Sequence, residues 1–193
     1  MQGNTAHMHS TPDRAPGCFP LRVALLGAES TGKSTLAAAL ADQYQTVWVA
    51  EYLREFVEVH ARTPQSHEQL MIARTQLARE DAAAAQARHY LFCDTTPLMT
   101  ALYSQFYFGA VDPALDAVAQ AYRYAYTIVA EPSNPWVADG LQRESDSVRQ
   151  QVHQLLLQAL AQAQARIPYL LVSGDTTQRL QQVSAYLSAQ HTT

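Results

Sequence analysis

The sequence predicts an α/β protein with a five-stranded parallel sheet that helices cover on both faces. Short apolar runs alternate five times with longer Ala-, Leu- and Gln-rich segments, which is the pattern of such a sheet. The first apolar run also leads through a glycine-containing turn directly into one of these longer segments. With 193 residues and 48% hydrophobic residues, we expect a flexible N-terminal tail over 1–20 and a single domain over 21–193.

The five expected strands are short and apolar. Continuous apolar runs are typical of strands buried on both faces of a parallel sheet. We expect strands at 21–26, 46–51, 90–94, 126–130 and 169–173. The second and third end in acids, Glu51 and Asp94. Because ligands of parallel sheets gather at the carboxyl ends of the strands, these acids are candidates for a site.

The remaining segments are rich in good helix formers. We expect helices at 33–43, 66 to about 88, from 97, 113 to about 123, 147–165 and 176 to about 189. The helix from 66 has an expected apolar stripe of Leu70, Ala73, Leu77 and Ala84.

Several helix starts have capping signals. Ser66 with Gln69 fits a capping box. Thr96 precedes Pro97, which suits the first position of a helix. Asp175 is the expected cap of the last helix.

Composition excludes several classes of protein. The net charge is -4 and no dense Lys/Arg run occurs, so we expect no nucleic-acid partner. No apolar stretch approaches the ~18 residues that span a membrane, so we expect no membrane association. Cys18 and Cys93 do not form a disulfide framework, and the N-terminus does not resemble a signal peptide. These features favour a cytoplasmic protein, and the scattered histidines do not suggest zinc.

The turn after the first strand matches the phosphate-binding pattern G-x-x-x-x-G-K-[ST]. The expected nucleotide-binding residues are Gly27, Ala28, Glu29, Ser30, Thr31, Gly32, Lys33, Ser34 and Thr35. Backbone amides of such a loop surround phosphate oxygens, and the following helix directs its positive end toward them. We expect Lys33 to reach the β- and γ-phosphates and Ser34 to bind Mg²⁺. The pattern alone does not separate a kinase from an ATPase or a GTPase.

The acids that end the strands are the candidates for catalysis. Asp94 is expected to hold Mg²⁺ or to accept a hydroxyl proton, and the alternative is that it caps the helix from 97. Glu51 and Arg54 are expected to bind hydroxyls of an acceptor, and Tyr52 to stack on a ring. The alternative for Arg54 is a surface salt bridge with an acid such as Glu55.

Three further segments have two interpretations each. Residues 135–149 contain Arg143 and Arg149 and are either a lid over the phosphates or an ordinary loop. Residues 173–179 suit the adenine side of the nucleotide or are a capped helix start. A third group either packs in the core or walls an acceptor pocket: Tyr103, Phe106, Tyr107 and Phe108.

Four segments together resemble the ribosylnicotinamide kinase domain of NadR-type proteins, an AAA-type ATPase/kinase group of NAD metabolism. They are Gly-Ala-Glu-Ser-Thr-Gly-Lys-Ser (27–34), Glu-Tyr-Leu-Arg-Glu-Phe (51–56), Phe-Cys-Asp-Thr-Thr (92–96) and Trp-Val-Ala-Asp-Gly-Leu (136–141). The resemblance implies a three-layer P-loop kinase fold with strand order 2-3-1-4-5. It also implies phosphoryl transfer from ATP, with Mg²⁺, to the 5′-hydroxyl of nicotinamide riboside, which gives nicotinamide mononucleotide.

The resemblance assigns roles to residues as well. Lys33 and Ser34 serve ATP and Mg²⁺, and Glu51 and Asp94 face the riboside, one of them as the base. The lid residues are Asp139 and Arg143, and Arg179 borders the adenine. The family usually has Arg directly after Asp-Gly-Leu, where this sequence has Gln142 followed by Arg143.

Two other functions remain open from the sequence. The chain is alternatively a kinase for a different nucleoside, or a regulatory ATPase that acts on a protein partner. We expect no adenylyltransferase or helix-turn-helix domain within these residues, and the oligomeric state is left open.

Overall fold

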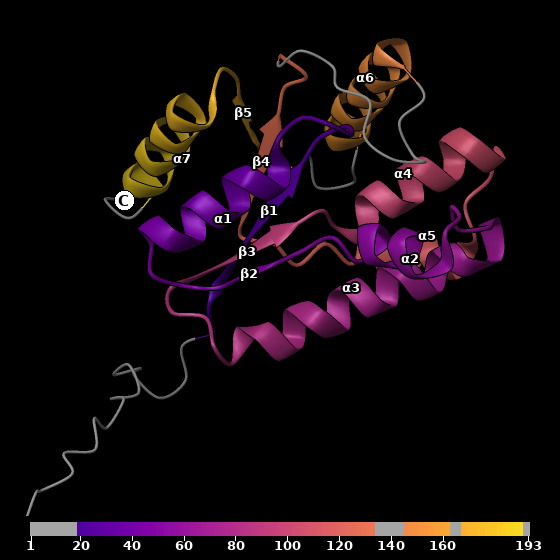
Figure 1. Ribbon diagram of the computed structural model, residues 1–193, viewed down its shortest axis with the longest axis horizontal. Coiled ribbons are helices and arrows are strands. Elements are labelled where there is room, and N and C mark those ends of the chain that lie inside the picture. Colours follow the sequence, from indigo (N-terminus) through magenta and orange to yellow (C-terminus); the bar gives the residue numbers. More distant parts are fainter. Residues whose placement is uncertain (1–18, 134–144, 163–166, 191–193) are drawn as a thin grey trace, which may run out of the picture.

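A computed structural model describes residues 19–133, 145–162 and 167–190. The sheet consists of β1 (Leu21–Leu26), β2 (Trp48–Val49), β3 (Tyr90–Asp94), β4 (Tyr126–Ala130) and β5 (Leu170–Val172). All neighbouring strands are parallel, and their order is β2-β3-β1-β4-β5. The expected fold class and strand order are therefore confirmed (Figure 1).

Helices lie on both sides of this sheet. They are α1 (Lys33–Gln43), α2 (Tyr52–His60), α3 (Gln69–Ala84), α4 (Pro97–Phe108), α5 (Pro113–Gln120), α6 (Asp146–Gln162) and α7 (Thr176–Gln190), with a short 3-10 turn η1 at Ser66–Glu68. The helices α1 and α7 share one buried cluster with β1, β3 and β4, and α4 and α6 share another with β1 and β4. Alternate residues of β1 therefore face opposite layers: Val23 and Leu25 face α1, whereas Ala24 and Leu26 face α4 and α6.

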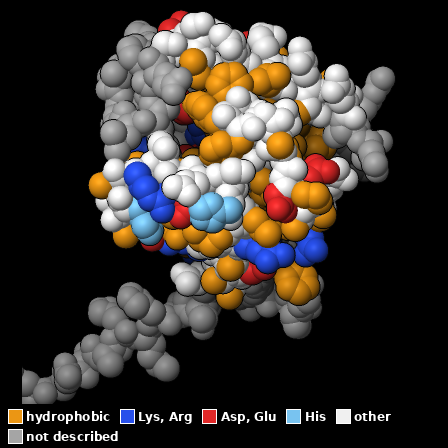
Figure 2. Space-filling model, turned by 90° about the vertical axis from the view of Figure 1, so that its right-hand side faces the viewer, with side chains coloured by type: hydrophobic (Ala, Val, Ile, Leu, Met, Phe, Trp, Pro, Cys, Tyr) orange, Lys and Arg blue, Asp and Glu red, His pale blue; other side chains and the backbone are white. Residues whose placement is uncertain are grey.

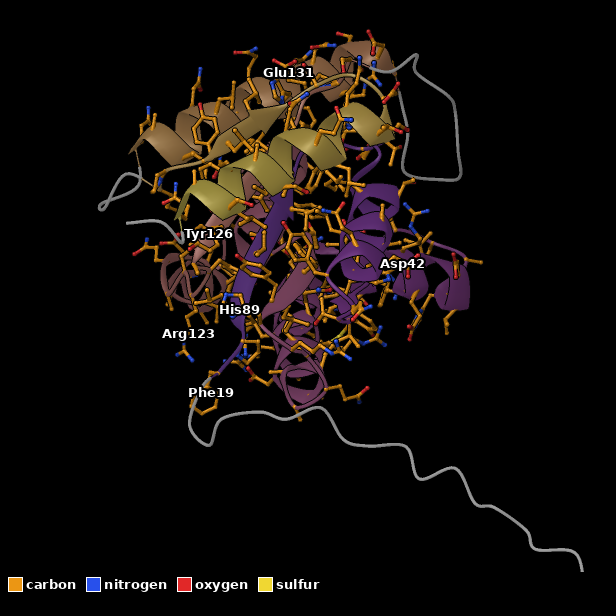
Figure 3. All side chains as sticks on the ribbon, turned by 90° about the vertical axis from the view of Figure 1, so that its left-hand side faces the viewer. Phe19, Asp42, His89, Arg123, Tyr126 and Glu131 are labelled. Carbon is orange, nitrogen blue, oxygen red and sulfur yellow. The ribbon has the colours of Figure 1, made fainter. Side chains whose placement is uncertain are left out.

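All strands point in one direction, so their carboxyl ends share one edge. Figure 3 shows Phe19, before β1, and Arg123, before β4, toward one end of the molecule, whereas Glu131, directly after β4, lies at the other. The phosphate-binding turn and the ends of β2 and β3 belong to the same end as Glu131. This edge is where a parallel sheet binds ligands.

The edge strands are shorter than expected. The strand β2 contributes two residue pairs to β3, Trp48 with Phe92 and Val49 with Cys93. Glu51 was expected to end this strand, and it is instead the N-cap of α2, a helix that the sequence analysis did not predict. The backbone thus leaves the sheet two residues before Glu51.

The capping box expected at Ser66 and Gln69 is wrong by one residue. Gln65 is the N-cap, and its backbone N–H donates to Oε2 of Glu68 at 2.8 Å. Thr96 does precede Pro97 at the start of α4. Asp175 and Gln178 bond reciprocally at the start of α7, since each backbone amide donates to the other side chain.

The apolar stripe expected on α3 is confirmed in part, since Leu70 and Ala73 belong to one hydrophobic cluster and Ala84 packs against another. Only Ala73 of the four is buried, and Leu70, Leu77 and Ala84 are half-buried. The buried side of α3 consists instead of Gln69, Ile72, Ala73, Gln76 and Glu80. Three polar side chains therefore point from α3 into the molecule, and one of them is central to the site described below.

None of the helices in the described residues is both long enough and apolar enough to cross a membrane.

Candidate active site

The phosphate-binding turn joins β1 to α1 and has a strained backbone that glycine permits. Gly27 has a φ of 147°, and a Cβ added there would lie 2.8 Å from the carbonyl oxygen of Ala130. Gly32, at φ 80°, is the N-cap of α1. Both glycines are therefore required by the backbone conformation, and no acidic side chain occupies the first turn of α1. This leaves the positive end of α1 available to an anion.

Lys33 lies folded against this turn. Its Nζ donates to the carbonyl oxygen of Ala28 at 2.8 Å, and the same oxygen accepts from the Thr31 hydroxyl at 2.8 Å. Lys33 is 8% exposed and is the sole lysine of the sequence. The turn thus holds one positive charge directly beside its backbone amides.

Ser34 and Asp94, the two residues considered for magnesium binding, lie in contact. The Ser34 hydroxyl donates to Oδ2 of Asp94 at 2.5 Å. Asp94 is 1% exposed, and its Oδ1 is buried without a hydrogen bond from any described residue. Thr96, rather than Asp94, is the N-cap of α4, so the alternative capping role does not apply.

These two side chains fit a magnesium ion. Mg²⁺ binds to oxygen ligands and takes one or two carboxylates together with phosphate oxygens and water. A hydroxyl and a carboxylate with an unpartnered buried oxygen, placed beside a phosphate-binding turn, supply that set. In the described part of the chain, His, Cys, Asp and Glu do not cluster in threes as a protein-only metal site would need.

A cleft of about 430 Å³ opens beside the turn. Its walls come from the phosphate-binding turn, α2, α3, the end of β3 and α4. The sequence analysis named several of its lining residues, and these are Gly27, Glu29, Ser30, Lys33, Glu51 and Arg54. The surface at this end of the molecule mixes hydrophobic, acidic, basic and histidine side chains (Figure 2).

Aromatic side chains of α4 form one wall of the cleft. Tyr103, Tyr107 and Phe108 line it, whereas Phe106 packs in the cluster shared by α4 and α6. The rings of Tyr103 and Tyr107 are stacked, with centroids 6.0 Å apart and 15° between their planes. Burial, with the negative charges of Glu29 and Glu51, raises the pKa of the Tyr103 phenol well above its usual value, so this hydroxyl stays protonated beside two acids.

The helix α2 places Arg54 at the cleft, where it was expected, and Tyr52 outside the lining of the cleft. Arg54 lines the cleft and has no ion pair with a described residue. The surface salt bridge forms instead between Glu55 and Arg79, at 2.7 Å. The Arg79 guanidinium lies 4.5 Å from the ring centre of Tyr52, which is not among the residues that line the cleft.

Arg179 connects the phosphate-binding turn to the end of β4. It is 1% exposed, and its Nη1 donates to the carbonyl oxygen of Thr31. Its Nη2 donates to the carbonyl oxygen of Glu131 and to the Ser133 hydroxyl, both at 3.0 Å. The guanidinium therefore fixes two backbone segments next to each other.

The expected lid falls mainly on residues that the structure leaves undescribed. Asp139, Arg143 and the Trp-Val-Ala-Asp-Gly-Leu segment lie outside the described residues. Arg149 is described; it is 4% exposed and pairs with Asp146 at 2.5 Å.

The helix over residues 52–60 and the wall that α3 contributes to the cleft were not expected from the sequence. Leu53, Val57 and Gln76 line it, and none of them was a candidate. The signal for α2 was present, because Leu53, Phe56 and Val57 have helical spacing. Gln76 had no such signal, since a glutamine in a helix is usually exposed.

A phosphate-binding turn after the first of five parallel strands, with a serine–aspartate pair beside it, defines a P-loop nucleotide-binding protein. The sheet order is that expected of P-loop kinases. The chain belongs to the AAA domain family, whose model matches residues 22–179.

Curated relatives match most of this chain. It is 33% identical over 152 residues to the trifunctional NAD biosynthesis/regulator protein NadR of Salmonella typhimurium, covering 76% of this chain and 37% of that protein. It is 33% identical over 156 residues to the protein of the same name in Escherichia coli, covering 77% of this chain and 38% of that protein. The expected resemblance to NadR-type proteins is confirmed, and the chain spans well under half the length of these relatives.

Solved structures share the fold. A crystal structure of NadR protein in complex with NR matches with a TM-score of 0.74 and 21% identity, over 88% of this chain and 52% of that one. Thymidylate kinase from Candida albicans matches with a TM-score of 0.64 and 11% identity, over 90% of this chain and 93% of that one. Deoxyadenosine kinase from M. mycoides matches with a TM-score of 0.59 and 13% identity, over 88% of this chain and 100% of that one. The fold is thus that of P-loop kinases.

Proposed function

We propose that this chain is an ATP-dependent kinase that phosphorylates the 5′-hydroxyl of nicotinamide riboside and forms nicotinamide mononucleotide. The observation that carries the proposal is the contact between Ser34 and Asp94. Their chain neighbours Lys33 and Thr95 line a cleft together with Glu51 and tyrosine rings. Such a site has a phosphate-binding end and an acceptor end. The identity to the NadR proteins, and the shared fold with a NadR structure in complex with NR, support this acceptor.

At the phosphate-binding end, the amides of residues 27–35 would surround the β- and γ-phosphates. The Lys33 ammonium would leave the Ala28 carbonyl and pair with these oxygens, which carry more charge than a carbonyl. Ser34 and Asp94 would hold Mg²⁺, which when bound neutralises charge on the phosphate oxygens.

At the acceptor end, we assign Glu51 as the base. It lines the cleft, whereas Asp94 is bonded to Ser34 and is not one of the lining residues. The acceptor oxygen would attack the γ-phosphorus, its proton would pass to Glu51, and the bond to the bridging oxygen of ADP would break. Arg54 would bind acceptor hydroxyls, and the wall that contains Tyr103 would contact the ring.

The remaining expected residues belong to closure and to nucleotide placement. Asp139 and Arg143 are proposed as lid residues, with Arg143 as the arginine that approaches the transferred phosphoryl group. Arg149 is already paired with Asp146, which favours Arg143 for this role. Arg179 would affect ATP binding indirectly. Its guanidinium bonds the Thr31 carbonyl and so would hold the turn that surrounds the phosphates. Tyr52 has no proposed contact with the acceptor, because Arg79 covers its ring.

A screen of acceptors with Mg·ATP tests the proposal. Nicotinamide riboside, nicotinic acid riboside, deoxyadenosine and thymidine 5′-monophosphate are compared by kcat/KM. We expect nicotinamide riboside to exceed the last two by at least about a hundredfold, since buried polar groups of a site reject mismatched ligands. A higher kcat/KM with deoxyadenosine would assign the site to a different nucleoside. An ADP release rate that no acceptor changes would instead indicate a regulatory ATPase.

A further inference from the structure

Gln76 is a buried amide in the middle of α3, where an apolar residue would be expected. It is 2% exposed and lines the cleft. Its Oε1 accepts from the backbone amide of Tyr52 at 2.8 Å, and its Nε2 donates to the carbonyl oxygen of Asp94 at 3.5 Å. Burying an amide is costly unless its polar groups are bonded, and here they bond two backbones that bear site residues.

The first of these backbones is the start of α2. The opening turn of a helix has amides without helical partners. Glu51 is the N-cap, yet its carboxylate makes no capping bond to α2. Gln76 satisfies the Tyr52 amide from another helix, so the backbone directly after Glu51 is fixed without using the Glu51 side chain.

The second backbone is the end of β3. The strand β2 stops at Val49, opposite Cys93, and so provides no paired residue for Asp94. Gln76 supplies a donor to the Asp94 carbonyl at this point, while the Asp94 side chain accepts from Ser34. Gln76 therefore lies between the residue that ends β3 and the residue that starts α2.

The position of Gln76 is itself fixed one turn along α3. Glu80 is fully buried, and both of its Oε atoms lie 3.0 Å from the Tyr124 hydroxyl. Arg22 Nη1 donates to Glu80 at 3.3 Å. These contacts tie the helix that carries Gln76 to β1 and to the residues before β4.

We infer that Gln76 is a positioning residue, which rests on the proposed function: it sets the separation between Glu51 at the acceptor end and Asp94 at the magnesium end. It would touch neither ATP nor the transferred phosphoryl group. Its loss would misplace the acceptor hydroxyl and its base relative to the phosphate. We therefore expect kcat and the KM for the acceptor to change, and the binding of ATP to stay the same.

The test compares Gln76→Met, Gln76→Glu and Gln43→Met. Methionine keeps the length of the side chain and removes both bonds, whereas glutamate keeps the acceptor for the Tyr52 amide. Gln43 is the control, because its amide joins α1 to Ser184 on α7 at 2.8 Å, outside the residues that line the cleft. For Gln76→Met we expect kcat to fall about 10- to 100-fold, with KM for ATP changed less than about threefold. The kcat of Gln76→Glu should lie between those of Gln76→Met and the wild type, and the kcat of Gln43→Met should equal that of the wild type.

Hydrogen exchange of the Tyr52 amide provides a readout that does not need turnover. It should be faster in Gln76→Met than in wild type and should remain slow in Gln76→Glu and Gln43→Met. Three results for Gln76→Met would each overturn the role of Gln76. They are a kcat equal to that of the wild type, a change confined to KM for ATP, and an unchanged rate of hydrogen exchange at the Tyr52 amide. A wild-type protein that transfers no phosphate refutes the proposed kinase instead, and exchange then still decides whether Gln76 holds α2. If Gln76→Met does not fold, Gln76→Asn is measured in its place.

Discussion

The Ser34 hydroxyl donates to Oδ2 of Asp94 across 2.5 Å, although 60 positions separate the two residues in the chain. The contact exists because β1 and β3 are neighbours in register, with Leu25 opposite Asp94. The turn after β1 and the last residue of β3 thus reach the same edge of the sheet. A hydroxyl and a carboxylate are brought together at the point where phosphate would bind.

Asp94→Asn should remove most of the turnover. The amide keeps the size of the side chain but loses the charge that would bind Mg²⁺. We therefore expect kcat to fall at least about a hundredfold, and the Mg²⁺ concentration that gives half of the maximal rate to rise. Steady-state rates at increasing Mg²⁺ measure both effects. Asp42→Asn is the control, since Asp42 is an exposed residue of α1 (Figure 3). Full activity of Asp94→Asn would exclude the proposed magnesium role.

Lys33→Ala should abolish turnover without unfolding the protein. Because Lys33 is the sole lysine, an amine-acylating reagent should modify only this side chain and the chain's amino terminus. Mg·ATP should slow the modification of Lys33, because its ammonium would then be paired with phosphate. Mass spectrometry of the labelled peptide measures this protection. Equal labelling with and without Mg·ATP would contradict the predicted contact.

Glu51→Gln should lower kcat while ATP binding persists. Removing a general base typically costs about 10²- to 10⁴-fold, and the Glu51 carboxylate lines the acceptor cleft rather than the phosphate-binding turn. Glu55→Gln on the same helix is the matched control, because Glu55 forms an exposed pair with Arg79 and such pairs contribute little. Calorimetry with a non-hydrolysable ATP analogue checks binding. Activity of Glu51→Gln near that of the control would transfer the role of base to another residue.

Glu80 should make the stability of the protein depend on pH near neutrality. Burial raises the pKa of this carboxyl to about 7 from an ordinary 4.5, against the opposing effect of Tyr124 and Arg22. Between these values the folded protein retains a proton that the unfolded chain has lost, so the free energy of unfolding falls as pH rises through this window. Glu80→Gln should therefore be more stable than wild type at pH 8, by up to about 3 kcal/mol, with the difference shrinking at pH 5.

Urea unfolding at both pH values measures the effect of Glu80. The companion variant Asp81→Asn alters the exposed partner of Arg22 and should leave this pH dependence in place. A pH-independent difference between Glu80→Gln and wild type would show that the carboxyl is charged throughout.

Local patterns explain why much of the site could be predicted. The turn at 27–35 and the acid Asp94 each depend on a few neighbouring residues and on the rule that parallel strands end at one edge. The central strands β1, β3 and β4 were predicted at their observed bounds, because buried runs of apolar residues are distinctive. The strand order came from the family resemblance and not from any periodicity.

The errors concern residues whose environment is set by distant parts of the chain. The expected stripe of α3 followed apolar residues, whereas Gln76 and Glu80 are buried because Tyr52, Asp94 and Tyr124 provide partners. The expected stacking of Tyr52 on a ligand ring stays a prediction, and only the structure places the Arg79 guanidinium above this tyrosine ring. The N-cap lies one residue earlier than expected, at Gln65, and Ser66–Glu68 form a 3-10 turn before α3 begins at Gln69. Such partners are not encoded in the local spacing of residues.

Transfer of label from [γ-³²P]ATP tests the central claim most directly. With Mg²⁺ and nicotinamide riboside present, we expect the label to appear in nicotinamide mononucleotide in equal amount to the ADP formed, and only when the riboside is supplied. Label released as inorganic phosphate at a rate that the riboside does not change would contradict the proposed kinase activity.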